Sequence, residues 1–124
     1  MAIYSTVITE IGPNAKEFLE EDMMVLFGDD APEALRPYCF LIEQNVLENE
    51  IQLGYELFID DEKYEITAVG NVVNKNLKDL GHITINFSGE TVADLAGTLY
   101  VENKQVNAIK EGTTIKISEK AAAH

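Results

Sequence analysis

The chain has 124 residues, enough for one domain with its own hydrophobic core. Hydrophobic residues make up 46% of the chain and charged residues 25%, a balance typical of a globular domain rather than a disordered one. Lysine and arginine number 9 against 22 acidic residues, and the formal net charge of -13 argues against binding to nucleic acid or to an anionic membrane surface. A basic protein partner would suit this charge.

The single cysteine, Cys39, cannot form an internal disulfide, which favours a reducing cytoplasm. No stretch of the sequence reaches the roughly 20 apolar residues that a membrane-spanning helix needs. The first residues also lack the basic and then apolar pattern of a signal peptide. We therefore expect a cytoplasmic protein. Residues 119–124, which end in His124, follow the last patterned segment and are expected to form a frayed tail.

Short runs rich in β-branched and aromatic residues predict eight strands. These strands are expected over residues 3–11, 23–27, 38–42, 55–59, 64–69, 82–87, 98–101 and 114–117. Asp60 and Asp61 suit the turn of a hairpin between the fourth and fifth strands.

Two short helices are expected between the strands. Asn14 is a candidate cap for a helix over residues 15–21, and Glu17 completes a capping-box pattern. A second helix over residues 76–80 should stop at Gly81, because glycine readily adopts the conformation that ends a helix. One more helical turn is expected over residues 32–35.

Segments of the two halves match at a nearly constant offset. Residues 8–12 resemble residues 66–70 at an offset of 58. Further matches at offsets of 58 to 60 pair Phe27 with Phe87, Leu35 with Leu95, and residues 51–59 with residues 109–117. We therefore predict an all-β fold, a compact closed β-barrel with two or three short helical turns and a pseudo-two-fold internal duplication. Residues 1–118 would form its single domain, with repeats of about 1–60 and 61–118.

Most patterns that mark an enzyme are missing from the sequence. All eight glycines stand alone, which excludes a glycine-rich phosphate loop, and one cysteine with two histidines cannot form a standard zinc site. His82 is the histidine in the body of the predicted fold, and it follows Gly81 at the start of a strand. A neutral imidazole at a barrel rim can act as a base or a nucleophile. The alternative is a histidine that only satisfies nearby backbone groups.

Cys39 lies in a run of five apolar residues, 38–42, which suits a strand buried on both faces. This pattern predicts a small, unreactive core residue rather than a catalytic thiol.

Several segments carry a resemblance to a known family. They are Ile-Thr-Glu-Ile-Gly at 8–12, Ala-Pro-Glu-Ala-Leu at 31–35 leading into Tyr-Cys-Phe at 38–40, Ile-Thr-Ala-Val-Gly at 66–70, residues 76–84, and the regions of Gly97 and Gly112. On these segments, which cover essentially the whole chain, the sequence resembles the glucitol/sorbitol-specific enzyme IIA family of the bacterial phosphoenolpyruvate-dependent sugar phosphotransferase system.

The resemblance implies a cytoplasmic phosphocarrier with a compact β-barrel fold. Such a protein takes a phosphoryl group from phospho-HPr onto a histidine. It passes the group to the IIB component for sugar uptake, and its partners are HPr and the IIB and IIC components of the sugar permease. It would be one component of a protein-histidine sugar phosphotransferase. The resemblance implies no metal or organic cofactor.

One position departs from the family pattern. Relatives carry histidine shortly after the Tyr-Cys-Phe run, as in Tyr-Cys-Phe-Ile-His-Cys-His, and the phospho-accepting role is usually placed there. Here the two histidine positions hold Ile42 and Gln44, and only His82 of the Gly-His-x-Thr segment is kept. Thr84 lies two residues on and would either orient a phosphate or act as an ordinary strand residue.

Three interpretations remain open from the sequence. His82 is the candidate phospho-acceptor in the first of them. In the second, the chain is a non-catalytic regulatory or binding member of the family, because the usual phosphohistidine position is Ile42. The third is a barrel that binds a small ligand in its interior.

Overall fold

The computed structural model describes residues 2–106 and 108–119 of the chain. Apart from Glu119, the expected tail over residues 119–124 lies outside the described residues. The elements follow one another as β1 (Ala2–Ile11), α1 (Ala15–Leu19), β2 (Met23–Phe27), a 3-10 helix η1 (Arg36–Tyr38), β3 (Phe40–Ile42), β4 (Glu56–Ile59), β5 (Glu62–Val69), α2 (Val73–Leu80), β6 (Ile83–Asn86), β7 (Thr98–Val101) and β8 (Thr114–Ser118). Over the described part of the chain, both α-helices are too short to cross a membrane.

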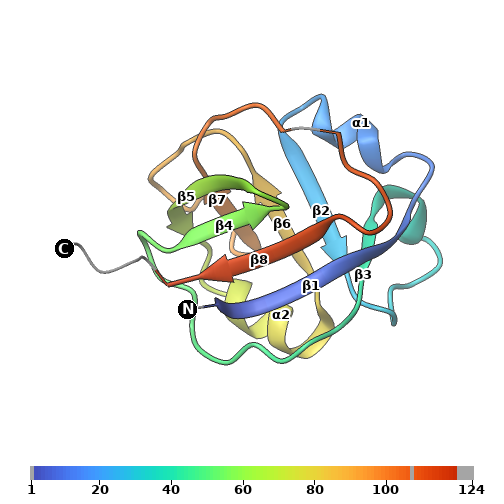
Figure 1. Cartoon of the computed structure of the whole chain (residues 1–124), viewed down its shortest axis with the longest axis horizontal. Coiled ribbons are helices and arrows are strands. Elements are labelled where there is room, and N and C mark those ends of the chain that lie inside the picture. Colours follow the sequence, from blue (N-terminus) through green and yellow to red (C-terminus); the bar gives the residue numbers. More distant parts are fainter. Residues whose placement is uncertain (1, 107, 120–124) are drawn as a thin grey trace.

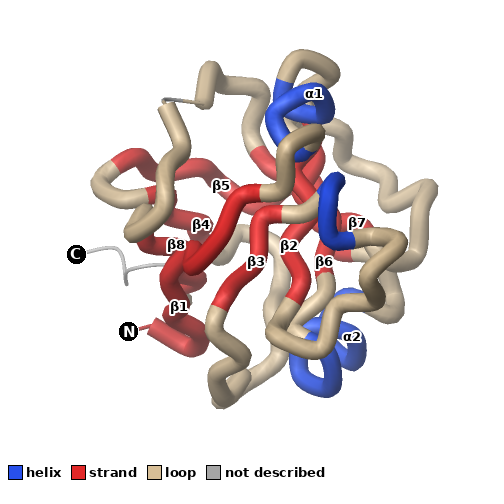
Figure 2. The backbone as a smooth tube through the Cα atoms, turned by 90° about the vertical axis from the view of Figure 1, so that its right-hand side faces the viewer, coloured by secondary structure: helices blue, strands red, loops and turns tan. Residues whose placement is uncertain are grey.

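The strands form a closed barrel in the order β1-β3-β2-β6-β7-β5-β4-β8 (Figure 1). Neighbouring strands are antiparallel except for the pairs β2–β3 and β6–β7, which are parallel. Figure 2 shows β3, β2 and β6 side by side, with α1 at one end of this wall and α2 at the other. The predicted all-β closed barrel is therefore confirmed.

The strand pairing in one half of the chain recurs in the other. Thr6 of β1 pairs with Ile115 of β8, and the corresponding pair, with the halves exchanged, joins Tyr64 of β5 to Leu57 of β4 at an offset of 58 residues. The irregular register between β1 and β3 also recurs at the matching place between β5 and β7. The barrel consequently has pseudo-two-fold symmetry.

The predicted match of Phe27 with Phe87 is wrong by one residue. The register of the two parallel pairs makes Leu26 of β2 correspond to Ile85 of β6, an offset of 59 rather than 60. Phe87 lies in the barrel core, whereas Phe27 lies in a second cluster outside it. Because successive residues of a strand point to opposite faces, a shift of one residue aligned side chains from opposite sides of the wall.

The first helix begins at Ala15 as predicted but differs in its cap and in its last residue. α1 stops at Leu19 rather than at residue 21, and over the residues described the side chain of Asn14 makes no capping hydrogen bond. The carbonyl oxygen of Asn14 instead accepts a hydrogen bond of 3.2 Å from the backbone N–H of Glu17. The capping box predicted here is therefore wrong, and a backbone carbonyl oxygen, rather than a side chain, accepts the hydrogen bond in the first turn of the helix.

The second helix begins earlier than predicted. α2 starts at Val73 rather than at residue 76, because Val73 and Leu77 are both buried against the core and extend the packed face by one turn. It ends as predicted at Gly81, whose φ of 65° lies in the left-handed region that favours glycine.

The segment before β3 is a turn followed by a short helix. The backbone N–H of Leu35 donates to the carbonyl oxygen of Pro32 at 2.9 Å, which closes the turn predicted over residues 32–35. The 3-10 helix η1 follows it and includes Tyr38, so β3 begins at Phe40 rather than at residue 38. The hairpin turn at Asp60 and Asp61 is present between β4 and β5.

Side chains fill the interior of the barrel. Strand residues of both halves form one buried cluster, and Ile51 and Ile109 from two long connections join it. Phe40 and Ile42 also belong to this cluster, whereas Cys39 and Leu41 lie in the second cluster outside the wall. The predicted burial of β3 on both faces is confirmed, and the filled interior argues against a barrel that holds a ligand inside.

The glycine after β5 provides a test of the barrel packing. A β-carbon at Gly70 would overlap the backbone carbonyl oxygen of Ala96, and one at Gly12 would overlap that of Arg36. We expect Gly70→Ala to lower the free energy of unfolding by about 1–3 kcal/mol, because backbone cannot move aside cheaply. At Gly97 the nearest atom would be 3.8 Å away, so Gly97→Ala serves as the matched control. Equal stability of the two variants in urea denaturation would contradict this packing.

Candidate functional site

His82 lies at the junction between α2 and β6. The N–H of Gly81 donates to the carbonyl oxygen of Leu77 at 3.0 Å, and the N–H of His82 donates to that of Asn76 at 3.3 Å. Ile83, the next residue, is buried in the barrel core. Since side chains alternate along a strand, His82 faces the outside of the barrel wall, where it is half-buried.

Two residues at the end of β2 hold the imidazole ring of His82. Its Nδ1 lies 3.1 Å from the carbonyl oxygen of Leu26, and the ring stacks on Phe27 with centroids 4.2 Å apart and planes inclined by 23°. A carbonyl oxygen can only accept a hydrogen bond, so Nδ1 carries the hydrogen in this contact. In the neutral ring the lone pair of Nε2 is then free. This arrangement suits a nucleophilic histidine, with one nitrogen held and the other available.

The approach of α2 to β2 requires a glycine after β2. The N–H of Gly28 donates to the carbonyl oxygen of Leu80 at 3.1 Å. A β-carbon at position 28 would lie only 2.6 Å from the same oxygen, and one at Gly81 would lie 3.1 Å from the backbone of Gly28. The two glycines therefore let the end of the helix, and with it His82, pack directly against β2.

The ring of His82 lies at the edge of the second hydrophobic cluster. This outer cluster consists of Phe27, Ala31, Cys39 and Leu41, all buried. Burial raises the pKa of the Cys39 thiol, and the nearby positive charge of Arg36 opposes this effect less strongly. The buried position agrees with the prediction that Cys39 is a small core residue.

The other positions of interest lie on different faces of the wall. Ile42 is fully buried in the barrel core and pairs with Ile8 of β1. Thr84 is half-buried on the same outer face as His82, and its backbone pairs with Val25 of β2. The second histidine of the chain, His124, lies outside the described residues.

Sequence reasoning proposed His82 as a candidate but did not identify the residues that hold its ring. Leu26 and Phe27 lie on β2, and 56 positions of the sequence separate Leu26 from His82. The internal repeat carried a usable signal, because β2 and β6 are equivalent strands of the two halves and pair with each other. The predicted offset of 60 residues between Phe27 and Phe87 was wrong by one residue, so the repeat did not reveal the contact of Phe27 with His82.

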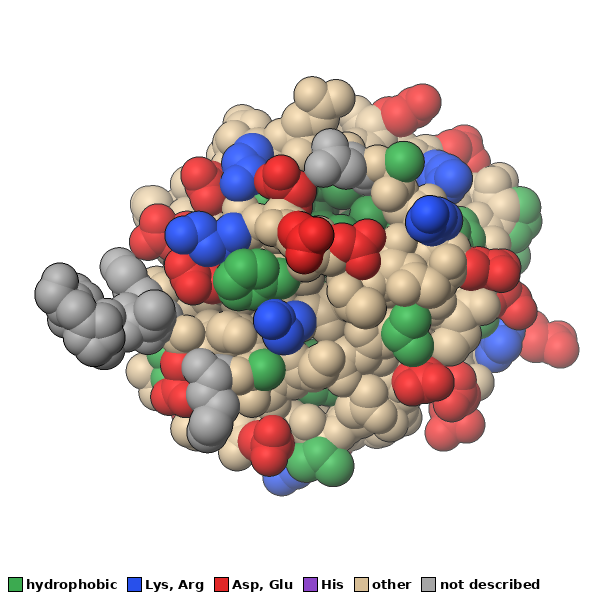
Figure 3. Space-filling model, in the orientation of Figure 1, with side chains coloured by type: hydrophobic (Ala, Val, Ile, Leu, Met, Phe, Trp, Pro, Cys, Tyr) green, Lys and Arg blue, Asp and Glu red, His purple; other side chains and the backbone are tan. Residues whose placement is uncertain are grey.

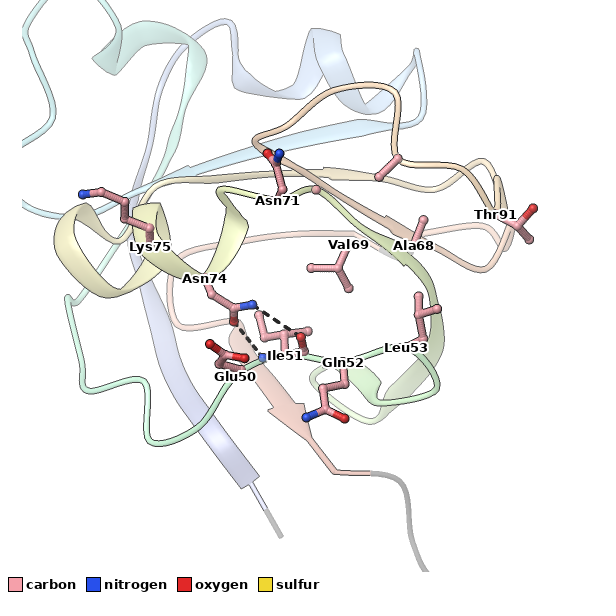
Figure 4. A pocket seen from close by; sticks show the side chains of 12 residues that line it. Glu50, Ile51, Gln52, Leu53, Ala68, Val69, Asn71, Asn74, Lys75 and Thr91 are labelled. Carbon is pink, nitrogen blue, oxygen red and sulfur yellow. Dashed lines mark hydrogen bonds between the residues drawn. The ribbon is translucent and has the colours of Figure 1, made fainter.

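An open hollow of about 660 Å³ lies beside α2 (Figure 4). The amide of Asn74 closes one side of it, accepting from the N–H of Ile51 at 2.7 Å and donating to its carbonyl oxygen at 3.4 Å. Lys75 and several amide side chains also line the hollow, but His82 is not among its lining residues. The hollow therefore offers polar contacts, but its lining contains no imidazole that could accept a phosphoryl group.

Burial of Cys39 predicts a pH dependence of the thiol. Because the pKa of the thiol is raised in the folded state, the unfolded chain loses this proton first as the pH rises above about 9. The contribution of Cys39 to folding stability is therefore constant below that pH and falls above it. We expect iodoacetamide to alkylate the native protein at pH 8 at least about tenfold more slowly than the urea-unfolded chain. Equal alkylation rates, followed by mass spectrometry, would show that the thiol is accessible.

Comparison with known proteins agrees with these features. A family model described as the PTS system glucitol/sorbitol-specific IIA component matches residues 3–116. The PTS system glucitol/sorbitol-specific EIIA components of Shigella flexneri and Escherichia coli (strain K12) are each 35% identical to the chain over 114 residues, which cover 92% of this chain and 93% of each relative. The crystal structure of the PTS system IIA component from Enterococcus faecalis V583 is similar, with a TM-score of 0.80 and 29% identity over 93% of this chain and 99% of that one. The chain therefore belongs to the family of glucitol/sorbitol-specific IIA components of the PTS system.

Proposed function

We propose that this chain acts in the cytoplasm as a phosphocarrier of a glucitol/sorbitol phosphotransferase system, with His82 as the phospho-acceptor. The observation that carries the proposal is the hydrogen bond from Nδ1 of His82 to the carbonyl oxygen of Leu26, which leaves Nε2 free. HPr would supply the phosphoryl group, and the IIB component of the IIB/IIC sugar permease would receive it. Family membership supports the relay role.

The transfer step is a displacement at phosphorus between two imidazoles. The lone pair of Nε2 attacks the phosphoryl group of the donor phosphohistidine, the new P–N bond forms, and the P–N bond of the donor breaks. The donor ring reacts as a phosphoimidazolium, whose other nitrogen carries a hydrogen, and it leaves as a neutral imidazole. The ring of His82 in turn becomes a phosphoimidazolium. No proton has to move, because Nδ1 keeps its hydrogen and its bond to the Leu26 carbonyl oxygen. The protein contributes mainly by positioning the ring.

Neither of the other two positions provides a comparable acceptor. Ile42 has no nucleophilic atom and lies in the barrel core. His124 lies in the segment expected to be a tail. His82 combines an imidazole, a place on the outer face and a fixed tautomer.

Phosphorylation of a single-residue variant tests the proposal. We expect phosphoenolpyruvate, enzyme I and HPr to label the wild-type protein, and we expect His82→Gln to abolish this labelling because it removes the nucleophile. A chain truncated after Lys120 lacks His124 and should be labelled like the wild type. Intact-protein mass spectrometry reads the label, which should be labile to acid and stable to base. Nuclear magnetic resonance of the phosphorylated protein should place the phosphorus on Nε2.

Labelling that survives His82→Gln would exclude His82 as the acceptor. A wild-type protein that stays unlabelled beside an active IIA control would contradict the phosphocarrier role and would favour a non-catalytic member of the family.

The charge of the chain supports a basic protein as the donor. The net charge is -13, and Figure 3 shows acidic side chains spread over one face of the molecule with fewer basic ones among them. Three lysines lie within 2.8–3.4 Å of a carboxylate oxygen, so part of the small positive charge is already paired. A donor with lysine or arginine around its histidine would be drawn to this surface.

Electrostatic steering predicts a salt-dependent transfer rate. We expect the second-order rate constant for phosphorylation by phospho-HPr to fall by about tenfold as the ionic strength rises from about 0.01 M to about 0.15 M, because the Debye length falls from roughly 30 Å to roughly 8 Å. The rate at saturating phospho-HPr should change much less, since steering acts on encounter. Rapid-quench measurements of labelling at several concentrations of phospho-HPr separate the second-order rate constant from the rate at saturation. A second-order constant that is independent of salt would argue against a steered encounter.

A further inference from the structure

The C-terminal end of α2 is held by strands that lie far away in the sequence. A helix leaves its last carbonyl groups without partners of its own. Here the carbonyl oxygen of Leu80 accepts from the N–H of Gly28 after β2 at 3.1 Å, and that of Asp79 accepts from Nε2 of Gln44 after β3 at 2.8 Å. Two strand ends therefore fix the two residues that precede the Gly81–His82 junction.

The side chain of Gln44 also fills the space beside the paired glycines. Its Oε1 and Cβ lie 3.2 Å and 3.4 Å from the place of a β-carbon on Gly28, and its Cγ lies 3.7 Å from the place of one on Gly81. Since a carbonyl oxygen accepts only, the bond to Asp79 fixes which end of the amide is the nitrogen. The Gln44 side chain thus packs beside the contact between Gly28 and Gly81, where the end of α2 meets the end of β2.

We propose that Gln44 is a positioning residue for His82. By holding the end of α2 against β2 it keeps Nδ1 of His82 within hydrogen-bond distance of the Leu26 carbonyl oxygen, and so keeps Nε2 free. The inference rests on the proposed function of His82 as the phospho-acceptor. It assigns to Gln44 a role in the orientation and tautomer of the acceptor ring rather than in the transfer itself.

The geometry explains why a small displacement of this helix end would matter. The ring is held by one hydrogen bond of 3.1 Å and by stacking on Phe27, and both partners belong to β2 rather than to the helix. A shift of the helix end relative to β2 lengthens the hydrogen bond directly. When that bond weakens, the hydrogen of the neutral ring is free to move to Nε2, which removes the nucleophilic lone pair.

The experiment compares three variants of the full chain. Gln44→Ala removes the side chain, whereas Gln44→Glu keeps its shape and removes the N–H donor to Asp79. Asn45→Ala is the matched control, because Asn45 follows directly and its Nδ2 also donates to a backbone carbonyl oxygen, that of Ser5 at 2.7 Å. It removes the same kind of bond from the same segment, but this bond runs to β1 rather than to the end of α2.

Two measurements follow the acceptor ring in each variant. Nitrogen-15 chemical shifts of His82 report which ring nitrogen carries the hydrogen in the unphosphorylated protein, and the initial rate of labelling by phospho-HPr reports its reactivity. We expect both Gln44 variants to lose part of the Nδ1–H tautomer and to be labelled about 5- to 20-fold more slowly than the wild type. Asn45→Ala should keep the wild-type tautomer and a rate within about twofold of the wild-type rate.

A wild-type tautomer and labelling rate in Gln44→Ala would overturn the proposal. So would an equal loss in Asn45→Ala, because the effect would then be a general loosening of the segment. The tautomer measurement needs no phosphorylation, so it judges the role of Gln44 even if the wild-type protein is never labelled at His82. The latter result would overturn the proposed function instead.

Discussion

Every strand of this barrel needs a hydrogen-bonded neighbour on each side, and the chain meets this requirement by interleaving its two halves. β2 and β6 join the halves on one wall, while β1 and β4 of the first half pair with β8 and β5 of the second on the opposite side. Neither half has enough pairs to close by itself, and an open half would expose strand edges. The same requirement brings the start of β6 to the end of β2. His82 therefore meets Leu26 and Phe27 because the barrel closes.

The two-fold symmetry creates two equivalent junctions between a helix and a strand, and they differ in chemistry. Gly81 before β6 and Asp22 before β2 both have positive φ, of 65° and 62°. The residue that follows is His82 at one junction and Met23 at the other, each at the start of a strand of the same antiparallel pair. The duplicated backbone thus offers one kind of position twice, and of these two positions only position 82 carries an imidazole. The candidate site therefore depends on side chains that differ between the two copies of a repeated backbone.

The sequence predicts a feature of the fold well when that feature depends on residues that are close together in the chain. The run from 38 to 42 predicted burial on both faces, because an apolar residue at every position leaves no side for solvent, and β3 has this burial. The start of α2 was predicted one turn too late, because three polar residues, 74–76, follow Val73, whereas burial of Val73 against the core sets the start. The contact of Phe27 with His82 depends on strand order and on register to the single residue. No local pattern records either of these.

The side of the barrel wall on which a residue lies decides whether it can exchange a phosphoryl group. Position 42 faces the core, where a phosphoryl dianion would be removed from water among apolar neighbours such as Ile8, at a large cost in free energy. Position 82 lies on the outer face, where the ring is partly exposed and its free nitrogen needs no opening of the core. Isoleucine at position 42 adds apolar volume to the interior of the barrel. The imidazole of His82, which we propose as the acceptor, thus lies on the outer side of the wall, where it is half-buried rather than enclosed by the core.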